Sequence, residues 1–143
     1  MITAMSTETE LESIAGMLRD DPRFAAAIVF GSVARGCPRP DSDLDLAVLY
    51  ADPAARGSAD REWLTLTGRL ALAAGRDVHL VDLEAADAGL RRAALDGGRV
   101  LLDREPRRLR DLRVATGIEY LDWAHARSIA DEAHARRLSR RHG

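Results

Sequence analysis

The stretch that decides the fold reads AAIVFGSVARGCPRPDSDLDLAVLY and covers residues 26–50. Its apolar runs at 26–30 and 43–50 predict two β-strands of a buried sheet. The glycine and two prolines at 36–40 exclude regular structure and predict a loop. A Gly-Ser pair directly follows the first strand, and a short helical turn is expected over 32–35.

Two aspartates interrupt the second apolar run. Because side chains alternate along a strand, Asp43 and Asp45 point to the same side, about 7 Å apart along the chain. Two like charges repel each other and lose hydration when the sheet is covered. A divalent cation is the simplest compensation, since hard cations prefer carboxylate oxygens. A solvated strand end would explain the two aspartates alone, so the prediction rests on their combination with the Gly-Ser loop.

The Gly-Ser pair suits a phosphate group. Gly31 lets the backbone turn tightly and approach a ligand closely. A turn that enters a helix also leaves free N–H groups, which attract an anion. One loop then offers phosphate-binding groups and the neighbouring strand offers metal-binding carboxylates, so the stretch predicts a site for a metal-bound nucleoside triphosphate.

The segments GSVARG (31–36) and DSDLDL (41–46) resemble the signature of the DNA polymerase beta-type nucleotidyltransferases. The resemblance is to the minimal nucleotidyltransferase (MNT) group, whose members act as antitoxins of HEPN-domain toxins. It covers roughly the first two-thirds of the chain well. It implies an α/β (α+β) fold, in which a small mixed sheet is flanked by helices and the nucleotidyltransferase core is followed by a C-terminal helix.

The resemblance also implies a catalytic site of three carboxylates, two Mg²⁺ ions and a phosphate cradle, with ATP as the substrate. Asp43 and Asp45 would supply two of the metal-binding carboxylates, and Asp77 the third. Gly31 and Ser32 would hold the terminal phosphates. Arg35 would add a bidentate phosphate contact, unless it only pairs with Asp41 on the surface.

One residue departs from the family pattern. His79 lies on the same face as Asp77, at a position that is often acidic in the family. We expect a packed or partly exposed histidine; the alternative is that it tunes the metal site or accepts a proton.

The rest of the chain predicts further elements around these two strands. Helical spacing of apolar residues predicts three helices. The first covers 8–19, the second runs from a cap at Asp60 to Ala74 and is ended by Gly75, and the third covers 85–95. Alternation predicts a strand over 77–81, and a last strand is expected over 99–102. We expect one domain over 1–143, with a core at about 8–103 and one or two helices over about 106–140.

The C-terminal helix carries apolar residues on two sides. One face is formed by Leu109, Leu112, Thr116, Tyr120 and Trp123. Ile118 and Leu121 lie on roughly the opposite side. Such a helix either packs entirely within its own domain or also offers a surface to a partner or a second copy.

Composition narrows the function. The 143 residues carry a formal net charge of −2, which argues against binding nucleic acid mainly through phosphate attraction. All 21 basic residues are arginine, so lysine-based chemistry is excluded. No apolar run approaches the ~20 residues that span a bilayer, and no secretory signal is visible. With a single cysteine, Cys37, the chain is expected to be cytoplasmic.

Three functions fit these observations. The resemblance favours an antitoxin that transfers AMP from ATP to a hydroxyl group, expected to be that of a tyrosine, on a cognate HEPN RNase toxin. The antitoxin would form a hetero-oligomer with this toxin. The second is a non-catalytic antitoxin that neutralises the toxin by binding. The third is a small-molecule nucleotidyltransferase. The small size supports the first, since relatives that act on nucleic acid carry additional domains that grip it.

Overall fold

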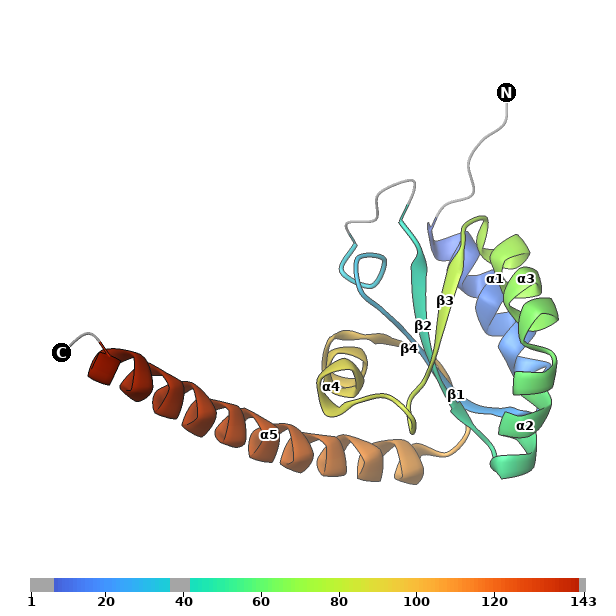
Figure 1. Cartoon of the computed structure of the whole chain (residues 1–143). Coiled ribbons are helices and arrows are strands. Elements are labelled where there is room, and N and C mark those ends of the chain that lie inside the picture. The colour runs from blue at the N-terminus through green and yellow to red at the C-terminus, as the bar shows by residue number, and fades with distance from the viewer. Residues whose placement is uncertain (1–6, 37–41, 142–143) are drawn as a thin grey trace.

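The computed structural model describes residues 7–36 and 42–141 and consists of a four-stranded sheet with helices on both faces (Figure 1). The elements follow the order α1 (Thr7–Arg19), β1 (Phe24–Phe30), β2 (Leu44–Tyr50), α2 (Pro53–Arg61), α3 (Trp63–Ala74), β3 (Val78–Asp82), α4 (Ala88–Gly97), β4 (Arg99–Asp103) and α5 (Pro106–Arg141). In none of the helices of these two ranges do length and apolar character together suffice to cross a membrane.

The sheet is mixed, as the family resemblance implied. Its strand order is β3-β2-β1-β4, and β1 runs antiparallel to both of its neighbours. β2 and β3 are parallel, with Leu44 opposite Val78 and Asp45 opposite His79. Because β2 and β3 are parallel, both strands begin at the same end of the sheet. The predicted acidic residues lie at this end.

Two apolar layers cover the sheet. On one face α1 and α3 contribute residues such as Ile14 and Leu70, which pack against Leu44 and Leu46 of β2. On the other face α4 and the start of α5 pack against the alternate residues of the strands, among them Ala47. Figure 1 shows α1, α2 and α3 on one side of the sheet and α4 on the other. β2 is thus buried on both faces, which explains its almost continuously apolar sequence.

The predicted helix from Asp60 to Ala74 is wrong at its beginning. Asp60 lies inside α2, a helix that the sequence analysis overlooked, and α3 begins at Trp63. The cap of α2 is Asp52, whose side chain accepts a hydrogen bond of 2.7 Å from the Ala55 N–H. Asp52-Pro53 is an ordinary helix start, because proline suits the first helical position.

Three smaller boundaries also differ from the predictions. Asp87 caps α4, so this helix begins at Ala88 rather than at 85. Asp43 and Asp77 each directly precede a strand instead of opening it. Of the one or two helices expected in the C-terminal segment, the structure has one, α5, which continues through Gly117.

Two adjacent glycines test the packing of α4 on the sheet. A Cβ at Gly98 would lie 2.2 Å from the Ala94 carbonyl oxygen and 2.3 Å from Cγ2 of Ile28, whereas one at Gly97 would meet nothing within 4 Å. We expect Gly98→Ala to lower the free energy of unfolding by about 2 kcal/mol through overpacking. Gly97→Ala is the matched control and should leave stability unchanged or slightly raised. Urea unfolding followed by circular dichroism measures both, and equal stabilities would contradict this account.

Candidate functional site

The Gly-Ser loop leaves β1 through a tight turn. Gly31 has φ 76°, a left-handed conformation that favours glycine. The Arg35 N–H donates to the Gly31 carbonyl at 3.2 Å, and the Gly36 N–H donates to the Val33 carbonyl at 3.2 Å. Val33 is buried in the α1/α3 layer and anchors the turn. The expected short helical turn is therefore present as a compact turn over 31–36.

Asp45 lies directly against this loop. It is paired with Phe30, the last residue of β1, and its side chain is 30% exposed. A Cβ added to Gly31 would lie 2.3 Å from Oδ2 of Asp45. The missing side chain of Gly31 thus allows the carboxylate to approach the backbone of the loop. This contact joins the predicted phosphate cradle to one of the predicted metal-binding carboxylates.

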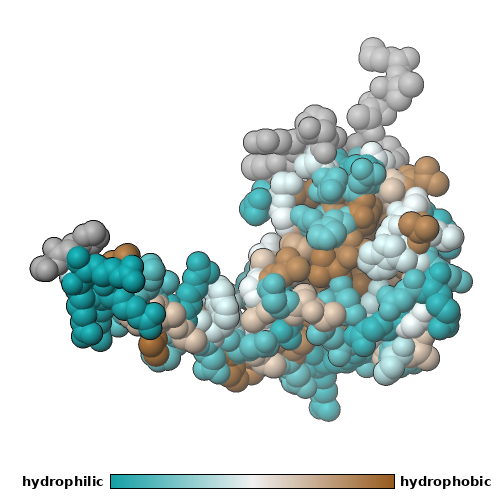
Figure 2. All heavy atoms as spheres, in the orientation of Figure 1, coloured by the Kyte–Doolittle hydropathy of each residue, from teal (hydrophilic) through white to brown (hydrophobic). Residues whose placement is uncertain are grey.

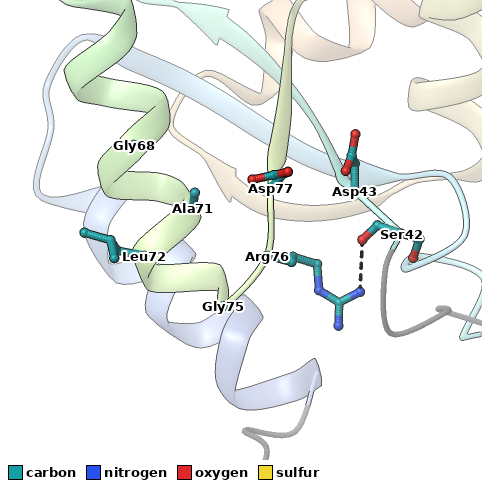
Figure 3. A pocket seen from close by; sticks show the side chains of 8 residues that line it. All are labelled: Ser42, Asp43, Gly68, Ala71, Leu72, Gly75, Arg76 and Asp77. Atoms are coloured by element: carbon teal, nitrogen blue, oxygen red, sulfur yellow. Dashed lines mark hydrogen bonds between the residues drawn. The ribbon is translucent and has the colours of Figure 1, made fainter.

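Asp43 and Asp77 line one open cavity of about 550 Å³ (Figure 3). Both are exposed, and the Leu44 N–H donates to the Asp77 carbonyl at 2.9 Å, which ties the two strand beginnings together. The remaining lining residues are Ser42, Gly68, Ala71, Leu72, Gly75 and Arg76. Within the described ranges, no ion pair involves either carboxylate, so their charge is free for a cation.

A buried ion pair holds the backbone segments that carry Asp43 and Asp77. Arg76 Nη2 lies 3.2 Å from Oε2 of Glu10, with only 13% and 8% of the two side chains exposed. Arg76 Nη1 also donates to the Ser42 carbonyl at 3.4 Å, as Figure 3 shows. Because Ser42 precedes Asp43 and Arg76 precedes Asp77, one guanidinium connects α1 to both acidic segments.

Glu10 and Arg76 were not predicted as site residues from the sequence. Their contact joins residues 66 positions apart, which no local spacing can predict. One signal was present, because Glu10 precedes Ile14 and Leu18 at intervals of four, on the apolar stripe of α1. A carboxylate on a buried stripe requires a partner.

His79 lies beside Asp45 on the neighbouring strand. The two residues are directly paired in the parallel ladder, and Nδ1 of His79 is 3.3 Å from Oδ1 of Asp45. The imidazole is 62% exposed. His79 is therefore exposed rather than packed in the core, and it contacts Asp45. Its role at a metal site stays a prediction.

The predicted site residues are thus only partly brought together. Asp43 and Asp77 share one cavity, while Asp45 contacts Gly31 and His79. In residues 7–36 and 42–141, no three His, Cys, Asp or Glu side chains form a group that could hold a metal ion unaided.

Arg35 is exposed and lines a different cavity, together with Arg92, Asp96 and Tyr120. Its alternative partner Asp41 lies outside the described residues, so the choice between a phosphate and Asp41 as its contact stays a prediction.

Comparison with known proteins identifies related chains. The model of the family "Polymerase beta, Nucleotidyltransferase" matches residues 12–107. Among curated proteins, none matches the chain significantly.

Three solved structures are similar over most of their length. A toxin–antitoxin complex with AMP-PNP contains a chain that is 30% identical, with a TM-score of 0.67 and coverage of 86% of this chain and 97% of that one. The structure of a tri-AMPylated Shewanella oneidensis HEPN toxin in complex with an MNT antitoxin contains a chain that is 28% identical, with a TM-score of 0.64. The match covers 90% of this chain and 98% of that one. An MntA–HepT toxin–antitoxin complex contains a chain that is 28% identical, with a TM-score of 0.63. The match covers 88% of this chain and 97% of that one.

The contact between Gly31 and Asp45 can be tested against a matched glycine. Gly31 and Gly36 have φ values of 76° and 74°, but only the Cβ of an alanine at 31 would collide with Asp45. Both alanine variants should lose about 1 kcal/mol of stability through left-handed strain. We expect Gly31→Ala alone to weaken binding of Mg²⁺·AMP-PNP, by about tenfold or more, in isothermal titration calorimetry. Equal affinities of the two variants would show that the contact does not shape the site.

Proposed function

The chain belongs to the polymerase beta-type nucleotidyltransferase family and resembles its minimal nucleotidyltransferase antitoxins, and from this membership we propose that it transfers AMP from ATP to a tyrosine hydroxyl of a cognate HEPN toxin. The observation that carries the proposal is the contact of Asp45 with Gly31, which brings a carboxylate against the loop that is proposed to bind phosphate. The similar complexes with AMP-PNP and with an AMPylated HEPN toxin support ATP and a protein acceptor. The need for ATP supports a cytoplasmic location.

In the proposed reaction the acceptor oxygen forms a bond to the α-phosphorus of ATP. The bond between that phosphorus and the pyrophosphate oxygen breaks, pyrophosphate leaves, and the hydroxyl proton is released. The Gly31–Ser32 backbone would hold the terminal phosphates, and Arg35 would add a bidentate contact. Positioning of the two reactants supplies much of the rate enhancement.

The carboxylates have the donor chemistry that Mg²⁺ requires. Asp43 and Asp77 offer hard oxygen ligands in one cavity, where neither has an ion-pair partner among the residues described, and Asp45 offers another beside the Gly31 loop. These three residues would hold the two ions. When bound, Mg²⁺ neutralises the triphosphate and lowers the pKa of the acceptor hydroxyl.

Neutralisation by binding alone is the second candidate. One observation favours it: an imidazole contacts Asp45 at a position that is often acidic in the family. Both proposed functions require the chain to bind the toxin, so both include a hetero-oligomer with it.

The carboxylates separate the two candidates. We expect Asp43→Asn and Asp45→Asn to abolish AMP transfer, measured as added AMP by mass spectrometry of the toxin after incubation with ATP and Mg²⁺. Each change removes one of two repelling charges, so stability should stay equal or rise slightly. Asp77→Asn should keep ATP binding and lose transfer.

Asp111→Asn is the control for these changes, because Asp111 is exposed on α5. Near-normal transfer by Asp43→Asn or Asp45→Asn would refute the metal-site assignment. If wild-type protein transfers no AMP and yet neutralises the toxin, the binding function holds instead.

The acceptor must dock in a fixed orientation, and α5 is the proposed docking element. Trp123 is 49% exposed, lies 5.7 Å from the Tyr120 ring between centroids, and is covered by the Arg127 guanidinium at 5.4 Å. Ile118 and Leu121 are exposed on the other side of the helix. Figure 1 shows α5 extending away from the sheet. Aromatic and arginine anchors of this kind dominate the energy of interfaces.

Trp123→Ala should weaken toxin binding by at least ~2 kcal/mol and leave ATP affinity and the circular dichroism spectrum unchanged. Trp63→Ala is the matched control, because Trp63 is 38% exposed on α3, across the sheet. Biolayer interferometry with the cognate toxin measures both. Unfolding of Trp123→Ala would assign the residue to the core, and equal affinities of the two variants would place the docking surface elsewhere.

A further inference from the structure

The two oxygens of the Asp45 carboxylate face different surroundings. Oδ2 lies where a Cβ of Gly31 would be, and Oδ1 lies 3.3 Å from Nδ1 of His79. His79 is the only residue directly paired with Asp45 across β2 and β3 in this ladder. The β3 side chain that contacts Asp45 is therefore an imidazole, whose nitrogen can bind a metal ion.

Asp77 is not in this position. It precedes β3, and its carbonyl receives the Leu44 N–H, so it lies beside the start of β2 and lines a cavity with Asp43. Asp45 does not line that cavity. A ligand that bridges Asp45 and β3 would meet His79 before it meets Asp77.

We propose that His79 completes the metal site beside Asp45, and that its imidazole shifts the preference of this site from Mg²⁺ towards a first-row transition ion such as Mn²⁺. The inference rests on the proposed function, because it assumes a divalent ion at the nucleotide. Its physical basis is the donor atom: Mg²⁺ takes oxygen ligands and dehydrates reluctantly, whereas imidazole nitrogen is a ligand of first-row transition ions. Mn²⁺ is the member of that row with the lowest affinity for such sites and the one most like Mg²⁺ in its ligands, so it gives the smallest shift that the imidazole should cause.

The geometry is compatible with a shared ion. Neighbouring ligands on an octahedral ion with bonds of about 2.1 Å lie about 3 Å apart, close to the observed 3.3 Å between Nδ1 and Oδ1. The site needs few protein ligands, since such ions are usually held by one or two side chains together with substrate phosphates and water. The lack of a three-ligand group in the described ranges is therefore expected for a site that the triphosphate completes.

His79 is also a site where substitution does not disturb the core. Its side chain is mostly exposed, on β3, an edge strand of the sheet. Neither His79→Asp nor His79→Ala removes an apolar contact from the two packed layers, in which His79 takes no part. Circular dichroism should show native spectra for both variants.

The test uses Mn²⁺ with tripolyphosphate, which contains no nitrogen, on the full chain. Electron spin echo envelope modulation detects ¹⁴N bound directly to Mn²⁺. We expect imidazole modulation in the wild type and in His125→Ala, a control at an exposed histidine on α5, and its loss in His79→Asp and His79→Ala. The ratio of Mn²⁺ to Mg²⁺ affinity should fall about tenfold or more in His79→Asp.

Absence of ¹⁴N modulation in the wild type, or an affinity ratio that His79→Asp leaves unchanged, overturns the inference. Failure of the proposed function gives a different result. If the chain transfers no AMP with either ion but still shows His79-dependent modulation, the metal site stands and only the catalytic proposal fails. Normal transfer with Mg²⁺ and no modulation leaves the catalytic proposal intact and removes the role of His79.

Discussion

The register of β2 against its two neighbours is the constraint on which the site depends. Pairing with β1 sets Asp45 at the Gly31 turn, and parallel pairing with β3 sets it beside His79. Because strand side chains alternate, a slip of one residue would turn the carboxylates into the α1/α3 layer and Leu44 and Leu46 out of it. The free energy gained by burying β2 on both faces therefore also fixes the position of its acidic end.

A second restraint acts on the backbone that precedes these strands. The Glu10–Arg76 pair is almost fully buried, and its guanidinium also reaches the Ser42 carbonyl. Removing one partner of a buried pair is costly, because the other charge is left without compensation. The segments that carry Asp43 and Asp77 are thus held by α1, on the face opposite α4. The carboxylates themselves stay exposed and have no ion-pair partner in the described ranges, so the restraint does not occupy the groups that are proposed to bind metal.

Local patterns predicted the strands β1 and β2 and the Gly-Ser turn, because apolar runs and turn chemistry are properties of neighbouring residues. The mixed sheet was implied by the family resemblance. The predicted shared face of Asp43 and Asp45 did not bring them into one cavity, because Asp43 precedes β2. Local patterns failed where distant segments decide. The Glu10–Arg76 contact depends on how α1 packs, and the proximity of His79 to Asp45 depends on the β2–β3 register. The α2 helix was overlooked for another reason. Its Gly57 and Ser58 lower helical propensity, and the cap at Asp52 outweighs them.

Figure 2 shows the distal part of α5 as a mainly hydrophilic arm, and Figure 1 shows how far it reaches from the sheet. Its 36 residues correspond to about 54 Å of helix, yet its buried residues are Leu109 and Thr116. Mechanically the helix is a lever whose pivot is its contact with α4. A rotation of about 10° at that pivot displaces the far end, roughly 37 Å away, by about 6 Å. A partner that binds the far end would therefore move by several ångströms for a small rotation at the contact with α4, where Arg91 pairs with Glu119.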